Sequence, residues 1–430
     1  MIKVLPAKSQ IDHLVDHLFR QETGRLVSVL TRAFGSENLD LAEDVVQDSL
    51  MEALDQWQSD GVPENPSAWL FQVAKNKALN IVNRKKYKRQ YSKEISHSLQ
   101  SERLAEPTLN HLFSEQEIQD DQLRMIFTCC HPAISPDSQI AIALKTLCGF
   151  SIPEIAKAFL TTEENINKRL VRARQKIREN RIPFEVPQGS ELENRLNTVL
   201  ETIYLLFNEG YNASKGMEIV RNDLCEEAIR LTQLLITNET IQSKGNVYAL
   251  LSLMILNASR FKARQDSDGN LLTMAEQDRS LWDKQMQSIG LSYLQRSTEN
   301  NDISIYHILA TISANYCIAP DYQSTDWGNI LSLYDSLIKL DNSPLVLLNR
   351  AIVVSKVSGP EKALADLEMI KDNPALKSYH LFYSTKAELL TEINQFENAA
   401  HALQMAIGFA PLKAEKDLLA RKLASCKARI

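Results

Sequence analysis

The sequence of 430 residues contains none of the short motifs that commonly mark an enzyme. It has no phosphate-binding loop, no G-x-S-x-G, no H-E-x-x-H, and no carboxylate–histidine cluster with catalytic spacing. Residues 266–270 resemble a calcium loop only faintly, because the acid that closes such a loop is missing, and we interpret them as a turn. We therefore expect no catalytic residue, no cofactor and no enzymatic activity.

Cysteines are few, and long apolar runs are absent. Six cysteines occur, and the only close pair, Cys129 and Cys130 followed by His131, lacks the spacing of a zinc knuckle. We expect reduced cysteines that pack in the core, and no metal site. No run reaches the roughly 18 apolar residues that a membrane span requires, and the N-terminus has no apolar core of signal-peptide length. These absences indicate a cytoplasmic protein that does not bind membranes.

Acidic residues are missing from one segment, residues 65–93, although the whole chain has a net charge of −6. That net charge argues against a protein that coats nucleic acid generally, so any contact with nucleic acid must come from local basic segments. Asn65 and Pro66 predict the start of a helix, because proline lacks an amide that would be unpaired in the first turn. The cations and interleaved aromatics of this helix suit phosphates and unpaired bases, although a solvated basic helix would show the same pattern.

Two helices are expected before this segment, at residues 14–33 and 40–57, because apolar residues recur there at helical spacing. Asp40 and Glu43 resemble a capping box at the start of the second helix. The outer face of that helix is acidic, with side chains four residues apart at Asp40, Asp44, Asp48 and Glu52. Such a stripe is either a solvated surface or a docking surface for a basic partner.

The sequence predicts a helix-turn-helix after a polar stretch that has the composition of a linker. Ser151 and Glu154 predict a capped helix with proline in its first turn, residues 160–162 break it, and a basic amphipathic helix follows. Two helices joined by a tight turn, the second of them basic, are typical of a DNA-binding helix-turn-helix. A basic helical hairpin without DNA contacts is the alternative.

Two prolines and a glycine interrupt the helical pattern at residues 182–189 and predict a domain boundary. The remaining sequence has helical periodicity and no alternating strand pattern. A set of small and apolar residues recurs there with an offset of 36, at Ala351, Ala363 and Leu367 and again at Ala387, Ala399 and Leu403. Small residues at fixed offsets let paired helices pack closely, as in tetratricopeptide repeats, and a general array of helical hairpins fits as well.

Together these segments resemble a bacterial RNA polymerase sigma factor of the extracytoplasmic-function (ECF) type, a branch of the sigma-70 family. The region-two motifs are LDLAEDVVQDSLMEALDQW and NPSAWLFQVAKNKALNIVNRKK, and the region-four motif is GFSIPEIAKAFLTTEENINKRLVRARQKIR. Three further stretches are similar to the subgroup with a long C-terminal extension of tetratricopeptide type: DDQLRMIFTCCHPAISPDSQIAIALKTLCGF, IYLLFNEGY and DLCEEAIRL. The resemblance therefore spans nearly the whole chain.

The resemblance implies an all-α fold in four segments. They are sigma region two at residues 10–92, a linker at 93–120, sigma region four at 121–182, and a helical domain like tetratricopeptide repeats at 190–430. It also implies a protein that binds core RNA polymerase, recognises promoter DNA and helps to open it for transcription initiation. The polymerase core would carry out the chemistry.

The resemblance further implies roles for particular residues. Region four would read the minus-thirty-five element with Glu164, Asn165, Asn167, Lys168, Arg169, Arg172, Arg174 and Lys176. Region two would hold a flipped base and the opened strand of the minus-ten element with Asp60, Asn65, Ser67, Trp69, Lys75, Asn76, Lys77, Asn80, Asn83, Arg84 and Lys85. The acidic stripe would bind the clamp coiled coil of the polymerase beta-prime subunit through Asp40, Glu43, Asp44, Gln47, Asp48 and Glu52. The polymerase beta flap is a further expected contact.

Two other interpretations compete with this one. A helix-turn-helix regulator that binds DNA without polymerase, and uses its repeats to sense a ligand or protein, would leave the acidic stripe and the basic segment as unrelated surfaces. A helical-repeat scaffold without DNA function would account only for the C-terminal half. In the sigma-factor interpretation, we expect the C-terminal domain to regulate the sigma module in cis and to bind a protein partner.

Overall fold

A computed structural model describes the chain in six stretches, residues 8–91, 112–159, 161–211, 221–266, 270–299 and 303–430. All regular elements within these stretches are helices, apart from an isolated bridge between Gln265 and Leu271. The expected all-α fold is therefore confirmed. Most of the expected linker, residues 92–111, and Leu160 in the expected break lie outside the described residues, as do the side chains at 8–17, 85–91 and 157–158.

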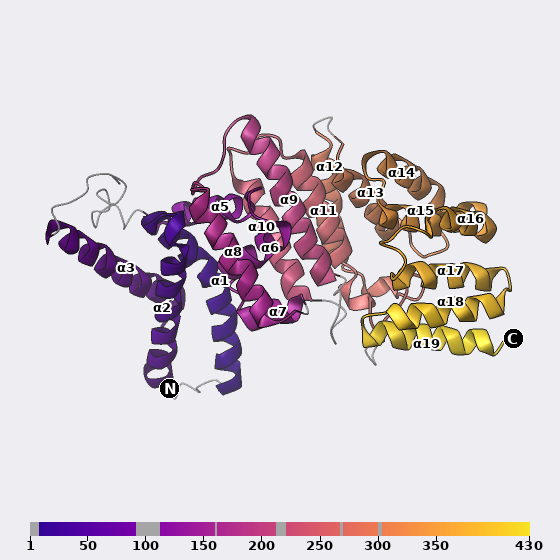
Figure 1. Cartoon of the computed structure of the whole chain (residues 1–430), viewed down its shortest axis with the longest axis horizontal. Coiled ribbons are helices and arrows are strands. Elements are labelled where there is room, and N and C mark those ends of the chain that lie inside the picture. The colour runs from indigo at the N-terminus through magenta and orange to yellow at the C-terminus, as the bar shows by residue number, and fades with distance from the viewer. Residues whose placement is uncertain (1–7, 92–111, 160, 212–220, 267–269, 300–302) are drawn as a thin grey trace. The chain divides into compact units, whose positions relative to one another are not determined.

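The chain divides into two compact units (Figure 1). Unit 1 comprises residues 1–205 with 237–240, and unit 2 comprises 206–236 with 241–430. Unit 1 therefore continues past the interruption at residues 182–189, where the prolines predict a boundary. The reason is packing by the first part of α9 (Ser190–Tyr211), in which the buried Arg195 donates a 2.5 Å hydrogen bond to the Phe127 carbonyl.

Unit 1 is organised around its first helix. Its elements are α1 (Lys8–Phe34), α2 (Leu39–Asp60), α3 (Pro66–Tyr91), α5 (Glu115–Cys129), α6 (Pro136–Thr146), α7 (Ile152–Ala158), α8 (Glu163–Glu179) and the start of α9. The helix α1 packs against α2, α3, α5 and α6, and its residues Leu26, Val29 and Leu30 are completely buried. One helix therefore holds together the segment with the acidic stripe and the segment with the helix-turn-helix.

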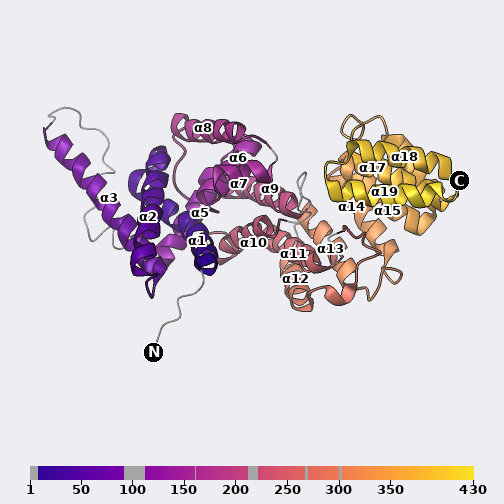
Figure 2. The same ribbon diagram turned by 90° about the horizontal axis from the view of Figure 1, so that it is seen from below.

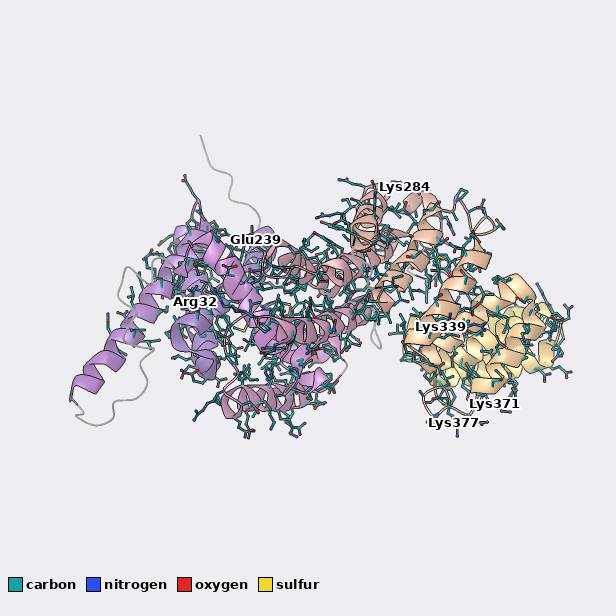
Figure 3. All side chains as sticks on the ribbon, turned by 90° about the horizontal axis from the view of Figure 1, so that it is seen from above. Arg32, Glu239, Lys284, Lys339, Lys371 and Lys377 are labelled. Carbon is teal, nitrogen blue, oxygen red and sulfur yellow. The ribbon has the colours of Figure 1, made fainter. Side chains whose placement is uncertain are left out.

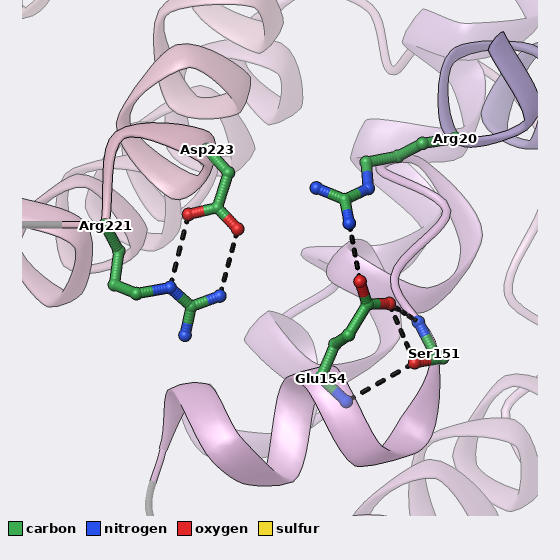
Figure 4. Close-up of polar contacts among 5 residues, drawn as sticks. All are labelled: Arg20, Ser151, Glu154, Arg221 and Asp223. Carbon is green, nitrogen blue, oxygen red and sulfur yellow. Dashed lines mark hydrogen bonds and ion pairs between the residues drawn. The ribbon is translucent and has the colours of Figure 1, made fainter. Parts of the chain in front are cut away.

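Two helix starts in unit 1 follow the predicted capping chemistry. The Asn65 side chain accepts a 3.0 Å hydrogen bond from the Ala68 amide at the start of α3. At the start of α7, the Ser151 amide donates to the Glu154 carboxylate at 2.7 Å, and the Glu154 amide donates to the Ser151 hydroxyl at 3.3 Å (Figure 4). Both predictions are confirmed.

The predicted capping box at Asp40 and Glu43 is wrong. A short 3-10 turn, Ser36–Asn38, precedes α2, so the helix already begins at Leu39 with Asn38 as its N-cap. Asp40 therefore lies inside the first turn, and its carboxylate is engaged by arginine side chains of α8. The sequence pattern predicted the helix correctly, but Asp40 and Glu43 form ion pairs with α8 and do not cap α2.

Unit 2 is a series of paired helices that follows the second part of α9. Its elements are α10 (Asn222–Thr237), α11 (Gly245–Ala258), α12 (Lys284–Ser297), α13 (Ile305–Ile318), α14 (Trp327–Leu340), α15 (Pro344–Ser358), α16 (Pro360–Ile370), α17 (His380–Glu392), α18 (Phe396–Phe409) and α19 (Lys413–Lys427). From α11 onward, consecutive helices pack on one another, and α17, α18 and α19 lie side by side in both views (Figures 1 and 2). Three exposed lysines mark this unit in Figure 3: Lys339 lies on α14, Lys371 directly follows α16, and Lys377 lies in the loop before α17.

The residues that recur with the offset of 36 form the contacts between paired helices. Ala351 of α15 and Ala363 of α16 share one buried cluster, and Ala387 of α17 and Ala399 of α18 share the next. All four alanines have no exposed surface, so their small side chains let the helix backbones approach closely. Arg350 stands where a large apolar residue is common in tetratricopeptide units, and it pairs with Asp335 at 2.7 Å and with Asp366 at 3.1 Å.

Candidate nucleic-acid and protein interface

The second helix of the helix-turn-helix presents a mostly polar outer face, in which Val171 is the exposed apolar residue at 55%. Its inner side chains, Ile166, Leu170, Ala173 and Ile177, are at most 1% exposed, so they hold α8 against the rest of unit 1. The exposed predicted residues are Glu164, Asn167, Lys168, Arg172 and Lys176. Positions three and four apart share one face of a helix, so these side chains can reach the same ligand together. Thr162 caps the helix by accepting a hydrogen bond from the Asn165 amide at 3.2 Å.

Three other predicted residues of α8 contact protein rather than solvent. The Asn165 amide group donates to the Thr161 hydroxyl at 2.6 Å. Arg169 pairs with Asp137 of α6 at 3.3 Å, and Arg174 pairs with carboxylates of α2. The helix therefore divides its cations between an exposed face, which includes Arg172, and a face that is neutralised by neighbouring carboxylates.

A surface hollow of about 520 Å³ lies along the acidic face of α2. It is lined by Asp48, Met51, Glu52, Asp55, Gln56 and Lys77. Asp44, Gln47, Asp48 and Glu52 are exposed, as predicted for a docking surface or a solvated stripe. Met51 is 57% exposed and Leu54 is 41% exposed, although both are apolar. Helical periodicity predicts Leu54 on the buried face, which is wrong, because the helix turns this side chain to the border of that face. Met51 was not identified, and its signal was a large apolar residue among acids on the outer face of the helix.

The first two acids of the stripe differ from the others. Glu43 has a side chain that is only 14% exposed, and it pairs with Arg174. Burial raises the pKa of Glu43 above its ordinary value, and the nearby Arg174 partly opposes that rise. Asp40 pairs with Arg174 at 2.8 Å and with Arg178 at 2.9 Å. The stripe therefore has a covered end near the start of α2 and an open end farther along it.

A second hollow, of about 640 Å³, lies at the start of α3. Its lining residues are Arg25, Asn65, Ser67, Ala68, Phe71, Gln72, Lys75, Phe113, Glu115 and Ile118. The hollow thus combines two aromatic rings, small polar groups and Lys75 with Arg25, which pairs with Glu115 of the same lining. Aromatic rings beside a cation suit a nucleobase with its phosphate. Sequence reasoning found Asn65, Ser67 and Lys75 but missed Arg25 and Phe113, because they come from other segments of the chain.

The remaining predicted residues lie along α3 and at the end of α2. Asp60 is exposed at the last position of α2, and Trp69 packs edge-on against Trp57 with ring centroids 5.5 Å apart. Lys77 pairs with Glu52 at 2.8 Å, so it bridges the acidic and basic helices. Four further residues, Asn76, Asn80, Asn83 and Arg84, are exposed on α3. Lys85 belongs to α3, and its side chain lies outside the described residues.

Comparison with known families assigns these segments. The family sigma-70 region 2 matches residues 18–87, and the family sigma-70 region 4 matches residues 124–177. The chain belongs to the sigma-70 family. In this sigma factor, region two is carried by α1, α2 and α3, and region four is carried by α5, α6, α7 and α8. The acidic face of α2 and the hollow at α3 therefore belong to region two, and the exposed face of α8 belongs to region four.

The C-terminal part of this sigma factor is an extension. Residues 195–298 match a family of unknown function, DUF6596. An uncharacterized protein of Rhizobium meliloti (strain 1021) is 35% identical over 403 residues, which cover 93% of this chain and 94% of that protein. The likeness therefore extends through both units. No solved structure matches the chain.

The packed thiols expected from the sequence are confirmed. All six cysteines are free and buried. Burial raises the pKa of Cys130 to about 12, so its thiol stays protonated at neutral pH. Among the described residues, no group of three or more His, Cys, Asp or Glu side chains could hold a metal ion, and no helix is both long and apolar enough to span a membrane.

Proposed function

We propose that this sigma-70 family protein is an ECF-type sigma factor that directs core RNA polymerase to promoters. The observation that carries the proposal is the exposed face of α8 on a helix-turn-helix whose inner residues are fully buried. Such a rigidly held helix can enter the major groove and present Asn167, Lys168 and Arg172 to base edges and phosphates of the minus-thirty-five element. In this role, the protein would bind core polymerase, and it would do so in the cytoplasm.

Region two would act on the minus-ten element through the hollow at the start of α3. A base that leaves the duplex loses stacking, which costs a few kcal/mol, and new contacts must offset that loss. Phe71 and Phe113 offer aromatic surfaces, and Lys75 offers charge for the phosphate. Arg25 pairs with Glu22 and Glu115, so its charge is largely neutralised within the protein. The exposed Asn76, Asn80 and Asn83 would continue the path of the single strand along α3.

The open end of the acidic stripe would bind the clamp coiled coil of the polymerase. Asp44, Gln47, Asp48 and Glu52 supply exposed charge and hydrogen-bond acceptors, and Met51 and Leu54 supply apolar surface between them. Charges of this kind steer a basic partner and set its register, while the apolar residues contribute area that becomes buried.

The proposed function is tested with the full-length protein and purified core polymerase. We expect the two to co-elute on gel filtration and to initiate transcription together at a promoter that core polymerase alone does not use. DNA binding without any association with polymerase would instead identify a polymerase-independent helix-turn-helix regulator.

Replacing Arg172 with Ala should weaken promoter binding, because this cation lies on the exposed face of α8. The expected loss is about 1–3 kcal/mol if Arg172 contacts a base edge, and less if it contacts a phosphate. Titrations at several salt concentrations separate the two, because only a lost phosphate contact reduces the salt dependence. Arg421→Ala, an exposed arginine of α19, is the matched control. If Arg172→Ala and Arg169→Ala bind the promoter with wild-type affinity at matched salt, α8 does not enter the major groove.

Unit 2 would regulate the sigma module in cis and bind a protein partner. Its paired helices, packed through fully buried alanines, form a repeat array of the kind that presents an extended binding surface. Transcription by a fragment that ends at Leu205 should then differ from that by the full-length protein. Higher activity of the fragment would identify an inhibitory extension, and lower activity an extension that assists assembly.

A further inference from the structure

Three arginines and two aromatic rings gather in unit 2, close to the ends of α9 and α11. The guanidinium carbon of Arg264 lies 4.1 Å from the centre of the Tyr211 ring, and that of Arg260 lies 5.9 Å from the same centre. Arg260 also lies 5.5 Å from the centre of the Trp282 ring, and Arg279 lies 4.8 Å from it. Arg260, Arg264 and Trp282 are 8%, 9% and 2% exposed, so most of this cluster is held out of water.

Two of the three arginines hold the carboxyl ends of helices. Arg264 donates a hydrogen bond to the Tyr211 carbonyl at the end of α9. Arg279 donates to the carbonyls of Tyr316, at 2.6 Å, and Ala319, at 2.5 Å, at the end of α13. The last carbonyls of a helix have no partner within it and carry partial negative charge, so a cation is favourable there. A role in the fold therefore accounts for the positions of Arg264 and Arg279.

Arg260 has no such role. Its guanidinium donates to the Tyr211 hydroxyl, to the Met274 sulfur at 2.9 Å and, at 3.4 Å, to the Asn257 side chain. All three acceptors are neutral, and a thioether sulfur accepts hydrogen bonds only weakly. Within the described stretches of the chain, Arg260 forms no ion pair with a carboxylate. A buried guanidinium with neutral partners is costly, because it has lost its hydration and gained no opposite charge.

The groups around Arg260 do not neutralise it either. Burial raises the pKa of Tyr316 to about 12, so this phenol is uncharged at neutral pH. Burial lowers the pKa of Arg279, the charge of Asp321 opposes that shift, and the positive charge of Arg260 adds to it. Asp321 itself is exposed, and its carboxylate accepts a 2.8 Å hydrogen bond from the Ser324 amide. Arg260 thus keeps a buried positive charge without a counter-ion in the described part of the chain.

A second donor without a partner lies next to Arg260. The indole Nε1 of Trp282 is buried, and none of the described residues accepts a hydrogen bond from it. Buried indole N–H groups usually have an acceptor. Two N–H···O hydrogen bonds of about 2.9 Å, one on each side of a small oxyanion, span about 8 Å between their donors. The guanidinium of Arg260 lies 5.5 Å from the centre of the Trp282 ring, so one oxyanion can reach both donors.

We propose that this place in unit 2 is a binding site for a small oxyanion, a phosphate or carboxylate group, that accepts hydrogen bonds from Arg260 and from the indole of Trp282. The planar fork of N–H donors on a guanidinium matches the paired oxygens of either group. Because both side chains are almost fully buried, the oxyanion belongs to a small molecule and not to the surface of a protein partner. The inference goes beyond the proposed function, which gives unit 2 only a protein partner.

The test uses the full-length chain in a buffer without oxyanions, titrated with inorganic phosphate and, separately, with succinate. Titration calorimetry measures the affinity, and the melting temperature should rise, because a ligand that binds only the folded state stabilises it by mass action. Potassium chloride at matched ionic strength controls for general salt effects. We expect saturable binding of phosphate or of succinate, and the tighter of the two identifies the group.

The variant Arg260→Met separates a ligand site from a role in the fold. Methionine removes the buried charge and keeps an apolar side chain, so the variant should melt no lower than the wild type in the oxyanion-free buffer. Its affinity for the probe should fall at least tenfold. Arg296→Met is the matched control, because Arg296 also donates to a tyrosine hydroxyl and lies over that ring, at Tyr248, but is exposed. It should bind the probe as the wild type does.

The variant Trp282→Phe keeps an aromatic ring and removes the indole donor. Losing one hydrogen bond to a charged group should lower the affinity for the probe about tenfold. This variant decides the matter if Arg260→Met melts lower than the wild type or does not fold. The proposal is overturned if neither probe binds saturably, if both variants bind with wild-type affinity, or if only a glutamate-rich peptide binds. None of these measurements needs polymerase, so their outcome does not depend on the proposed function.

Discussion

Double reversal of charge in the variant Asp44→Lys/Asp48→Lys should abolish binding to core RNA polymerase and leave the fold unchanged. Both side chains are exposed on the open end of the acidic stripe. Like charges forced together at an interface cost several kcal/mol, so the expected loss of affinity is at least about 100-fold. Exposed charges contribute little to folding stability, so the melting temperature should stay close to that of the wild type.

Glu193→Lys/Glu201→Lys is the matched control for this variant. It changes the net charge by the same amount at two exposed positions of α9 in the same unit. Competition of each variant with wild-type protein for core polymerase measures the effect directly. If the Asp44→Lys/Asp48→Lys variant competes for core polymerase as well as the wild type does, α2 is not part of the polymerase interface, whatever the control shows.

A fragment that ends at Gln188 should be far less stable than one that ends at Leu205. The shorter fragment lacks the first part of α9, in which Val199 and Leu200 have no exposed surface and Leu196 and Ile203 are also buried. At about 1.5–3 kcal/mol for each buried apolar side chain, the loss is on the order of 6–12 kcal/mol, which is comparable with the whole stability of a typical domain. The shorter fragment should therefore unfold or aggregate at room temperature.

Lost hydrogen bonds destabilise the shorter fragment further. Without α9, the Phe127 carbonyl loses the hydrogen bond from Arg195, and the Gln139 side chain loses the 3.1 Å hydrogen bond from the Thr202 hydroxyl. Urea denaturation of both fragments, followed by circular dichroism, compares their free energies of unfolding. Equal midpoints would show that the first part of α9 does not belong to the sigma module.

Much of the fold could be predicted because its signals are local. The spacing of Ile166, Leu170, Ala173 and Ile177 follows the period of a helix, so these residues were expected inside and are buried. The cap at Asn65 and the capping box of Ser151 with Glu154 depend on residues three apart, which a sequence displays directly. The 36-residue offset also predicted which alanines pack between helices in unit 2.

The sequence by itself therefore determined the helices, their buried faces, and the order of the acidic, basic and helix-turn-helix segments. Only the tertiary structure decided which charged side chains are exposed to solvent and which pair within the protein. Arg174 stands at the border of the buried face of α8 and Arg172 stands outside it, but only the structure shows that Arg174 is bound to Glu43, 131 residues away along the chain, while Arg172 is exposed. Helical periodicity contains no information about such a distant partner. Which cation faces solvent depends on where α8 lies relative to α2, and that position follows from packing between elements far apart in the chain, of α1 with α2 and α6 and of α6 with α8.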